Sequence, residues 1–254
     1  MTEPLARHIE GTTALVTGAN RGLGMAFVHA LLDRGAAKVY AGARNPGTVD
    51  ATDARVVPVQ LDITNFDDIA AAARDWSDVS LLVNNAGAML LAPFLSAPDM
   101  SAARTEMETN YFGTLAMARA FAPILRAAGG GGLVNVLSVV SWYASPFNAS
   151  YCASKSAEWA LTNALRVELR AQETLVVGVH AGFIDTDMAA TVDDPKISAQ
   201  EVAGQTLDAI EQGRPEVLTD EWTRHVKNSV TTDQDSLYPV VQRSWDAGES
   251  PWKR

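Results

Sequence analysis

Tyr151 and Lys155 are the residues of this chain whose types and spacing point most directly to chemistry. On a helix, positions four apart share one face with Cβ atoms about 5 to 6 Å apart, so a phenol and an ammonium can reach one substrate. A free tyrosine has a pKa of about 10, and a neighbouring cation stabilises its phenolate. The pair predicts a proton-transfer site in which Lys155 lowers the pKa of Tyr151. A solvated lysine stem lying against an aromatic ring is the alternative.

A glycine-rich turn near the amino terminus predicts a second part of the site. The apolar run that ends at Thr17 leads into Gly18, Gly22 and Gly24, after which a helical pattern begins. Glycines let backbone N–H groups approach a pyrophosphate, and the start of the next helix presents unpaired donors to it. The spacing G-x-x-x-G-x-G differs from the commoner G-x-G-x-x-G, but its place between strand and helix is the same. A mere loop of three glycines is the alternative.

Several motifs together make the chain resemble the short-chain dehydrogenases and reductases, over residues 13–186. Asp62 is similar to the family's adenine contact, and the run Asn84-Asn85-Ala86-Gly87 to the motif that closes its fourth strand. The resemblance implies a catalytic set of Asn110, Ser138, Tyr151 and Lys155. It also implies a set of cofactor-binding residues: Gly18, Asn20, Arg21, Gly22, Leu23, Gly24, Arg44, Asp62, Ile63, Asn85, Ala86, Gly87, Tyr151, Lys155, Gly182, Ile184 and Thr186.

The activity that this resemblance implies is reversible hydride transfer between a nicotinamide and a carbonyl or alcohol carbon. Tyr151 would be the general acid in reduction and the general base in oxidation, while Lys155 would also hold the nicotinamide ribose. Ser138 would donate a hydrogen bond to the carbonyl oxygen. In the family Asn110 steadies a water linked to the lysine, but an asparagine within a helix could equally be a packing or backbone partner.

The elements that must position these residues alternate between short apolar strands and longer helical patterns. This predicts one α/β domain over residues 1–254, a Rossmann-type doubly wound parallel sheet with helices on both faces. Strands are expected at 14–17, 38–41, 56–61, 81–84, 133–137, 176–180 and 216–219, and helices at 23–34, 66–76, 102–127, 150–171 and 199–212. The polar segment 45–53 is too short for a full helix and predicts a loop or a single turn.

Charge after the second expected strand favours one of the two nicotinamide cofactors. An NAD-selective site places an acidic residue about 20 residues beyond the glycine turn, where it repels a 2′-phosphate. This chain has no acid there and reads Ala-Gly-Ala-Arg-Asn over 41–45. Arg44 and Arg21 offer guanidinium groups suited to a phosphate, so NADP(H) is expected, with NAD(H) as the alternative. Both could also be ordinary surface arginines.

Composition narrows the classes of partner. The net charge of −10 disfavours nucleic acid or an anionic membrane. No run approaches about 18 apolar residues, and residues 1–10 lack the apolar stretch of a signal peptide, so a cytoplasmic protein is expected. The one cysteine, Cys152, cannot form an internal disulfide. The loop carboxylates Asp185, Asp187, Asp193 and Asp194 fit no familiar metal motif, and no catalytic metal is expected.

Two segments depart from the family pattern. His180-Ala181-Gly182 stands where the family usually has Pro-Gly, which frees the backbone and predicts a looser loop, with His180 as a structural residue. The carboxyl-terminal part is a charged, helix-like stretch that leads to a polar tail ending at Arg254, where many members have an apolar strand that helps assemble tetramers. By resemblance a homodimer through the helices at 102–127 and 150–171 is expected, with a homotetramer as the alternative.

The expected substrate is a hydrophobic or aryl ketone, aldehyde or alcohol. Its pocket would be formed by residues 89–94, 139–147 and 183–188, which follow the fourth to sixth strands and include Trp142, Tyr143, Phe147 and Phe183. These aromatic residues could as well be core or interface packing. A reductase of carrier-linked 3-oxoacyl thioesters is an alternative, but it would need a basic docking patch. A regulatory protein that only binds NADP(H) would be free to lose Tyr151 or Lys155.

Overall fold

Apolar, β-branched runs form the strands at the centre of the molecule. The structure is a computed structural model that describes residues 5–252. Four strands are buried along almost their entire length, namely β1 (Thr13–Thr17), β4 (Leu81–Asn84), β5 (Gly132–Val136) and β6 (Leu175–His180). Strands with apolar residues on both faces suit a parallel sheet covered on both sides. Their sequences lack the polar alternation of a sheet with one wet face for this reason.

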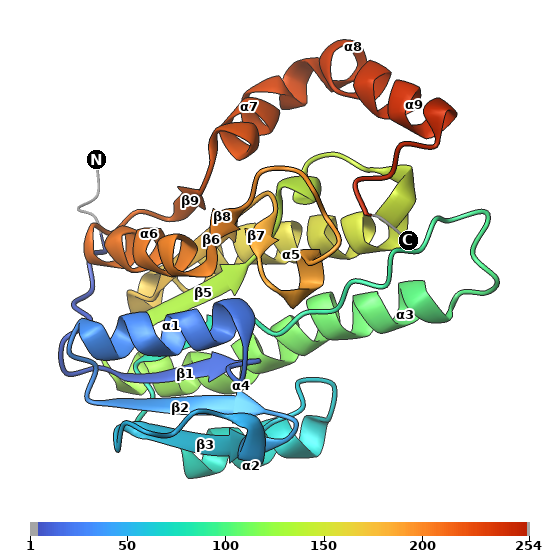
Figure 1. Cartoon of the computed structure of the whole chain (residues 1–254). Coiled ribbons are helices and arrows are strands. Elements are labelled where there is room, and N and C mark those ends of the chain that lie inside the picture. Colours follow the sequence, from blue (N-terminus) through green and yellow to red (C-terminus); the bar gives the residue numbers. More distant parts are fainter. Residues whose placement is uncertain (1–4, 253–254) are drawn as a thin grey trace.

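All seven strands of the main sheet are parallel, in the order β3-β2-β1-β4-β5-β6-β9 (Figure 1). The remaining strands are β2 (Lys38–Ala43), β3 (Val56–Gln60) and β9 (Glu216–Leu218). The order reverses direction between β1 and β4, so the loops after these two strands leave the sheet toward opposite faces. The predicted Rossmann-type sheet is therefore confirmed, including the short last strand.

Helices cover both faces of the sheet (Figure 1). One core cluster joins α1 (Gly22–Asp33) and α6 (Ala199–Glu211) to the strands, and their apolar residues include Phe27 and Leu207. A second cluster joins α2 (Phe66–Asp75), α4 (Thr114–Ala127) and α5 (Ala149–Glu168) to the other face. The predicted segment 45–53 contains only a 3-10 turn, Pro46–Thr48, as expected for its polar sequence.

The helix expected at 102–127 has an interruption that its sequence did not indicate. It is divided into α3 (Ser101–Met107), a π-helical segment (Glu108–Gly113) and α4. Asn110 lies inside the π-helical segment. Because π-helical turns are rare and often occur at functional sites, the interruption draws attention to this residue.

The carboxyl-terminal part forms an arm of three helices, of which the sequence indicated only a helix-like stretch. The arm contains α7 (Glu221–Ser229), α8 (Asp233–Ser236) and α9 (Tyr238–Ala247), and it lies above the rest of the molecule in Figure 1. A two-stranded pair, β7 (Ile184–Asp185) and β8 (Ile197–Ser198), encloses the segment that follows β6. Residues 253–254 of the predicted polar tail and residues 1–4 lie outside the described part, and the domain limits 1–254 stay a prediction.

None of the helices in residues 5–252 is both long and apolar enough to span a bilayer.

A pair of glycine substitutions tests the close packing after β1. We expect Gly24→Ala to lower the free energy of unfolding by about 2 kcal/mol or more, because its Cβ would lie 2.0 Å from the carbonyl oxygen of Gly18. Gly204→Ala on α6 is the matched control, since nothing lies within 4 Å of its Cβ, and it should stabilise by about 0.5–1 kcal/mol. Urea unfolding measures both. A Gly24→Ala protein as stable as the wild type would contradict the packing described.

Candidate active site

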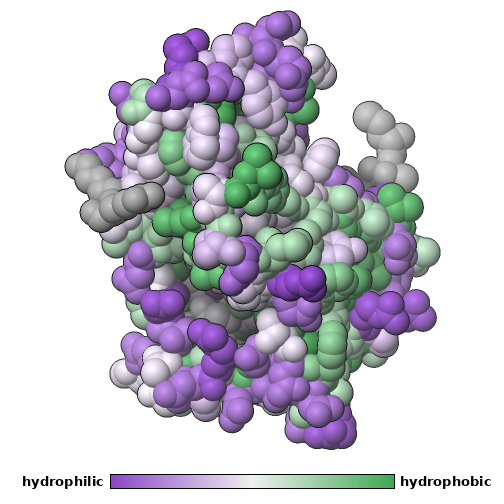
Figure 2. Space-filling view, turned by 90° about the vertical axis from the view of Figure 1, so that its right-hand side faces the viewer, coloured by the Kyte–Doolittle hydropathy of each residue, from purple (hydrophilic) through white to green (hydrophobic). Residues whose placement is uncertain are grey.

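The predicted site residues meet at the carboxyl edge of the sheet. The glycine turn follows β1, Asn85 to Gly87 follow β4, Ser138 follows β5, and the segment from Gly182 to Thr186 follows β6. Tyr151 and Lys155 extend toward them from the first turns of α5. Figure 2 looks onto the side toward which the strands of Figure 1 point, where hydrophobic residues gather between hydrophilic ones. The structure thus brings together groups from five separate parts of the sequence.

The glycine turn is an open cradle of backbone. Gly18 and Gly22 have φ of +64° and +53°, a region that L side chains rarely adopt. A Cβ at Gly18 would lie 3.1 Å from Cα of Ala86, and a Cβ at Gly22 would lie 3.3 Å from Thr186 Cγ2. Side chains at these positions would fill the space between the turn and the neighbouring loops. The turn, with Leu23 at the start of α1, therefore fits a pyrophosphate held by backbone N–H groups.

Thr17 joins the two loops that flank the crevice, a role that the sequence did not reveal. Its buried hydroxyl accepts hydrogen bonds from the backbone N–H groups of Asn85 and Ala86, both at 3.0 Å. The Asn85 side chain donates in return to the carbonyl oxygens of Thr17 and Gly18, at 2.9 and 3.2 Å. These bonds satisfy polar groups at the ends of β1 and β4 and fix the two loops relative to each other.

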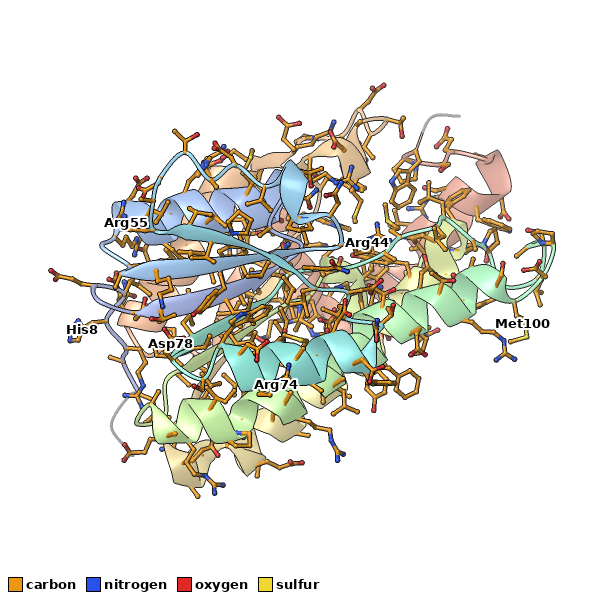
Figure 3. All side chains as sticks on the ribbon, turned by 90° about the horizontal axis from the view of Figure 1, so that it is seen from below. His8, Arg44, Arg55, Arg74, Asp78 and Met100 are labelled. Atoms are coloured by element: carbon orange, nitrogen blue, oxygen red, sulfur yellow. The ribbon has the colours of Figure 1, made fainter. Side chains whose placement is uncertain are left out.

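Arg44 and Arg21 are both exposed beside the glycine turn, and they differ in their partners. Arg44 follows β2 at the carboxyl ends of the strands, whereas His8 and Arg55 lie at their amino ends (Figure 3). Within residues 5–252 no carboxylate lies within 4.0 Å of it. Arg21 Nη1 lies 3.2 Å from Asp187 Oδ2 and so bridges to the segment after β7. Arg21 therefore has a carboxylate partner, whereas Arg44 has none among these residues.

Asp62, the expected adenine contact, and the predicted cofactor residues Ile63 and Asn20 are held by local contacts. Asp62 accepts hydrogen bonds from the backbone N–H and the hydroxyl of Thr64, at 2.9 and 2.7 Å. Ile63 is buried against the π-helical segment, where a Cβ on Gly113 would lie 2.9 Å from its side chain. Asn20 donates to the Thr48 hydroxyl at 3.1 Å. Asp62 follows β3 and Asn20 follows β1, so they lie on either side of the end of β2, the strand that Arg44 follows.

Asn110 connects the loop after β4 with α5. Its Oδ1 accepts from the Ala88 N–H at 2.8 Å, and its Nδ2 donates to the Ala88 carbonyl at 2.9 Å and to the Ser154 hydroxyl at 2.8 Å. The side chain is completely buried. A Cβ on the adjacent Gly87 would lie 3.2 Å from Asn110 Oδ1 and 3.8 Å from Lys155 Nζ, so the lysine ammonium is nearby. Asn110 therefore makes backbone and packing contacts, as the alternative to a catalytic role describes. Its expected role beside a water linked to the lysine stays a prediction.

Tyr151, Lys155 and Ser138, the residues predicted to transfer protons, lie close together. Lys155 Nζ lies 5.9 Å from the centre of the Tyr151 ring. Burial raises the pKa of Tyr151 above its ordinary value, while the Lys155 charge and the Ser138 hydroxyl act in the lowering direction. The sequence-based expectation is therefore corrected in one respect: Lys155 does favour the phenolate, but desolvation outweighs it. A phenol of this kind is protonated at neutral pH and can act as a proton donor.

Lys155 is held by a carboxylate that the sequence analysis did not consider. Its Nζ donates to the Val136 carbonyl at 2.8 Å and to Glu158 Oε2 at 2.6 Å. Both side chains are buried, with side-chain exposures of 5% for Lys155 and 2% for Glu158. The only available signal was a glutamate three positions after the lysine, a spacing that is equally common on solvated helix surfaces.

His180 has the structural character expected of it. Its ring is completely buried and stacks on Trp142 with centroids 3.9 Å apart, and Nδ1 lies 3.1 Å from the Ser138 carbonyl oxygen. Burial lowers the pKa of His180 to about 3, so the ring is neutral in neutral solution. Its contact with the Ser138 carbonyl oxygen helps to fix the backbone at Ser138.

The segment after β6 is fixed by Asp220. The Gly182 N–H donates to Asp220 Oδ2 at 2.9 Å, and Asp220 Oδ1 accepts from Thr223 as the N-cap of α7. In addition, the Ala181 carbonyl accepts from the Val139 N–H at 2.9 Å. The expected looseness from the missing proline is therefore opposed by these three bonds. Ile184 continues into β7 and Thr186 faces Gly22, so both predicted residues lie beside the glycine turn.

Aromatic residues of the carboxyl-terminal part contact three of the four aromatic positions predicted for a substrate pocket or for packing. Tyr143 meets Trp222 edge-on, Phe147 lies 5.0 Å from Trp245, and Phe183 lies 5.7 Å from Trp252 between ring centroids. The fourth, Trp142, stacks on His180. Phe147, Phe183 and Trp252 form one apolar cluster with Met89, Ala189 and Val192. The carboxyl-terminal part therefore adds apolar surface beside the segments after β4 to β6, which its polar sequence did not suggest.

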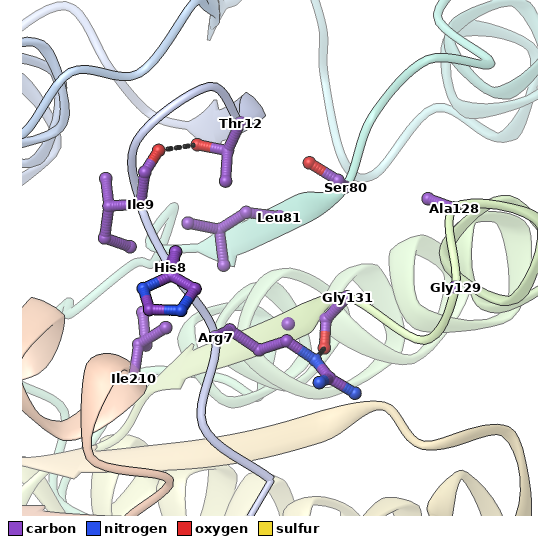
Figure 4. A pocket seen from close by; sticks show the side chains of 11 residues that line it. Arg7, His8, Ile9, Thr12, Ser80, Leu81, Ala128, Gly129, Gly131 and Ile210 are labelled. Atoms are coloured by element: carbon purple, nitrogen blue, oxygen red, sulfur yellow. Dashed lines mark hydrogen bonds between the residues drawn. The ribbon is translucent and has the colours of Figure 1, made fainter.

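A cavity of about 180 Å³ elsewhere in the molecule is separate from this site. Arg7, His8, Ser80 and Gly131 are among its lining residues, and it lies at the amino ends of β1, β4 and β5 (Figure 4). It is thus at the opposite edge of the sheet from Tyr151. In the described residues no three His, Cys, Asp or Glu side chains gather in a way that could hold a metal ion. A reaction without a catalytic metal stays a prediction.

Comparison with known proteins identifies the family of this site. The family model described as short chain dehydrogenase matches residues 12–196, which contain the glycine turn and all four residues of the predicted catalytic set. The chain belongs to the short-chain dehydrogenase family. It is therefore an oxidoreductase of a family that uses nicotinamide cofactors, and the family resemblance drawn from the motifs is confirmed.

Solved structures and curated proteins are similar to this short-chain dehydrogenase over most of its length. A short-chain dehydrogenase from Burkholderia cenocepacia J2315, in complex with NADP, is 44% identical with a TM-score of 0.88, covering 92% of this chain and 99% of that one. An NADP-dependent 3-hydroxy acid dehydrogenase from Schizosaccharomyces pombe is 28% identical over 72% of this chain and 75% of its own length. A 1-deoxy-11-beta-hydroxypentalenate dehydrogenase from Streptomyces exfoliatus is 28% identical over 92% and 96%.

Asp220 provides a test of how the arm is attached to the site. Burial alone would raise the pKa of its carboxyl, but hydrogen bonds from Gly182 and Thr223 outweigh burial and hold the pKa below its ordinary value of 3.8. We expect Asp220→Ala to reduce the free energy of unfolding by about 1–2 kcal/mol at neutral pH. The difference from wild type should shrink as pH falls through the depressed pKa, because the protonated carboxyl accepts these bonds more weakly than the ionised carboxylate does.

Urea unfolding at a series of pH values measures this difference. Asp75→Ala is the control, since Asp75 is an exposed residue paired only with the neighbouring Arg74, and it should cost less than about 0.5 kcal/mol at any pH. An Asp220→Ala effect of equal size above and below the depressed pKa would contradict the role given to the carboxylate.

Proposed function

We propose that this short-chain dehydrogenase is an NADP(H)-dependent carbonyl reductase and alcohol dehydrogenase for hydrophobic or aryl substrates. The observation that carries the proposal is the placement of Tyr151, with Ser138 and Lys155, beside a glycine cradle at the carboxyl edge of the sheet. A buried phenol with a cation and a hydroxyl next to it has the groups needed to protonate a carbonyl oxygen.

The residues present fit a bound dinucleotide. The cradle formed by Gly18, Gly22 and Gly24 suits a pyrophosphate, and Asp62 with Ile63 stands where an adenine would lie. Lys155 Nζ, close to Gly87, would hold the nicotinamide ribose together with the loop from Asn85 to Gly87. Gly182, Ile184 and Thr186, which follow β6, would hold the nicotinamide. When bound, the nicotinamide supplies the hydride in reduction and accepts it in oxidation.

Proton transfer is the part of the reaction that belongs to the chain's own side chains. In the reducing direction the Tyr151 phenol donates its proton to the substrate oxygen, and the phenolate that remains is stabilised by the Lys155 ammonium. Ser138 donates a hydrogen bond to the same oxygen as negative charge develops on it. In the oxidising direction the Tyr151 phenolate takes the proton of the alcohol. Asn110 acts here as a positioning residue, because its bonds to Ala88 and Ser154 fix the loop and helix that flank the lysine.

The choice of NADP(H) rests on Arg44. A 2′-phosphate at the end of β2 would meet the Arg44 guanidinium, which pairs with no carboxylate among residues 5–252. The Burkholderia cenocepacia protein that is 44% identical was crystallised with NADP, and the Schizosaccharomyces pombe relative is named as NADP-dependent, which agrees with this choice. NAD(H) would bind without that contact and is expected to be the weaker cofactor.

The preference for an apolar substrate rests on the wall formed by the arm. Phe147, Phe183 and Trp252, with Met89 beside them, face the region after β4 to β6 with apolar surface. A charged carrier domain would find little positive charge on a chain with net charge −10, which disfavours carrier-linked 3-oxoacyl substrates. Assembly as a homodimer or homotetramer stays a prediction.

Replacing the phenol tests the reaction. Purified protein is incubated with NADPH, and separately NADH, and a panel of aryl ketones, aliphatic ketones and a 3-oxoacyl thioester, with cofactor absorbance as the readout. We expect wild type to oxidise NADPH with an aryl ketone, and Tyr151→Phe to be slower by about 10²–10⁴-fold because the acid is lost. Tyr40→Phe, which removes a phenol bonded to Asp78 away from the predicted pocket, is the control. NADPH binding without turnover on any substrate, in either direction, would favour a regulatory protein.

Reversing the charge at Arg44 tests the cofactor choice. We expect Arg44→Asp to weaken NADPH binding by about 10- to 100-fold, because the variant loses a charge-assisted hydrogen bond and gains a repelling carboxylate. NADH binding should be unchanged or stronger. Arg74→Asp on α2, away from this edge in Figure 3, is the matched control. Fluorescence titration measures all four dissociation constants, and an unchanged NADPH affinity in Arg44→Asp would rule out this arginine as the phosphate ligand.

A further inference from the structure

Glu158 and Lys155 form a buried ion pair directly behind the proton-transfer group. Only 1% of Glu158 and 4% of Lys155 is exposed, and Nζ lies 2.6 Å from Oε2. The other carboxyl oxygen, Oε1, accepts from the Thr114 hydroxyl at 3.3 Å. Since each oxygen faces a donor, the geometry suits an ionised carboxylate, which can only accept hydrogen bonds.

The pair has consequences for both groups that would act on a substrate. Burial alone would lower the pKa of Lys155, but the Glu158 carboxylate outweighs it, so the pKa lies above its ordinary value. Burial raises the pKa of Glu158, and the lysine charge opposes that shift. At Tyr151 the two partners act in opposite directions, because Lys155 stabilises the phenolate and Glu158 destabilises it. A change at Glu158 therefore reaches the phenol through charge as well as through packing.

We propose that Glu158 is a positioning residue that holds the Lys155 ammonium between its own carboxylate and the Val136 carbonyl and offsets the lysine charge at Tyr151. The phenol then holds its proton to a higher pH than it would beside a lysine whose charge is not offset, and it can give that proton to a carbonyl oxygen. This inference rests on the proposed function and deepens it, since it assigns carbonyl reduction as the direction for which the resting site is prepared. Without Glu158, the predicted catalytic set would contain a lysine charge beside the Tyr151 phenol that no carboxylate offsets.

Few other charges face Tyr151 from the elements packed around it. On α5 the neighbouring Cys152 is neutral, because burial raises its pKa to about 11. From β6, His180 is neutral as well, because burial lowers its pKa to about 3. From the end of β5, Ser138 contributes only a hydroxyl. Glu106 on α3 acts on Cys152 and is bonded to Ser150. Lys155 and Glu158 therefore supply the opposing charges that the experiment has to separate.

The test is the pH dependence of Glu158→Gln. Alcohol oxidation needs the ionised phenol, so its kcat/KM rises with pH through the pKa of Tyr151. We expect the midpoint of this rise to fall by about one pH unit in Glu158→Gln, because the lysine charge is no longer offset. Tyrosinate absorbance reports the ionisation of Tyr151 directly when the titration of Tyr151→Phe is subtracted. The midpoint of this titration, measured without any cofactor, should be lower in Glu158→Gln by the same amount. Glu158→Asp, which keeps the charge, should restore the wild-type midpoint.

Glu106→Gln is the control, because it removes a buried carboxyl from a neighbouring helix without touching Lys155. It should leave the midpoint in place. A Glu158→Gln protein that loses activity or stability but keeps the wild-type midpoint would overturn the proposal and leave Glu158 a purely structural residue. Because the absorbance titration needs no turnover, it decides this point even if wild type proves inactive on every substrate, an outcome that would contradict only the proposed function.

Should Glu158→Gln fail to fold, nitrogen NMR of Lys155 in the wild-type protein decides instead. The proposal requires this lysine to remain an ammonium from neutral pH up to the pH at which Tyr151 ionises. A Lys155 signal that titrates to the neutral amine below that pH would overturn it, because a neutral lysine has no charge for Glu158 to offset.

Discussion

The reversal of strand order between β1 and β4 is the constraint on which the rest of the site depends. A sheet covered by helices on both faces leaves no room for a ligand, except where two neighbouring loops part toward opposite faces. The polar backbone exposed at that parting has to be satisfied, and the hydroxyl of Thr17 and the side chain of Asn85 do this for both loops at once. The glycines then keep the opening free of side chains.

Burial of charge is the second theme of the structure. An ammonium at the end of a closed sheet cannot be left alone, so a carboxylate from the same helix and a strand carbonyl share it. A carboxylate at the start of the arm is similarly satisfied by backbone N–H groups, and this attaches α7 to the segment after β6. His180 follows the other route and remains neutral. Lys155, Glu158 and Asp220 thus each have partners of suitable charge or polarity, while His180 is uncharged.

The sequence predicted those parts whose signals are local. Apolar runs, glycine spacing and a Tyr-x-x-x-Lys motif each depend on near neighbours, and they predicted the parallel sheet, the glycine turn after β1 and the placing of Tyr151 and Lys155 on one helix. What escaped prediction depends on the folded chain. Nothing in a glutamate three positions after a lysine distinguishes a buried pair from a solvated surface. The arm escaped because its polar and aromatic residues become one apolar wall only when Trp245 and Trp252 reach Phe147 and Phe183 from a distant part of the sequence.

The π-helical segment around Asn110 also limits where the chain can tolerate an insertion or a deletion. A π turn contains one residue more than the α turn that it replaces, so removing a single residue between 108 and 113 would restore a regular helix. Everything before the deletion would then rotate by about 100° relative to α4, carrying the side chain of residue 110 off the loop after β4. Relatives should therefore tolerate insertions and deletions in the flanking loops far more readily than within this segment. In a relative that lacks one of these residues, the asparagine would no longer contact the loop after β4.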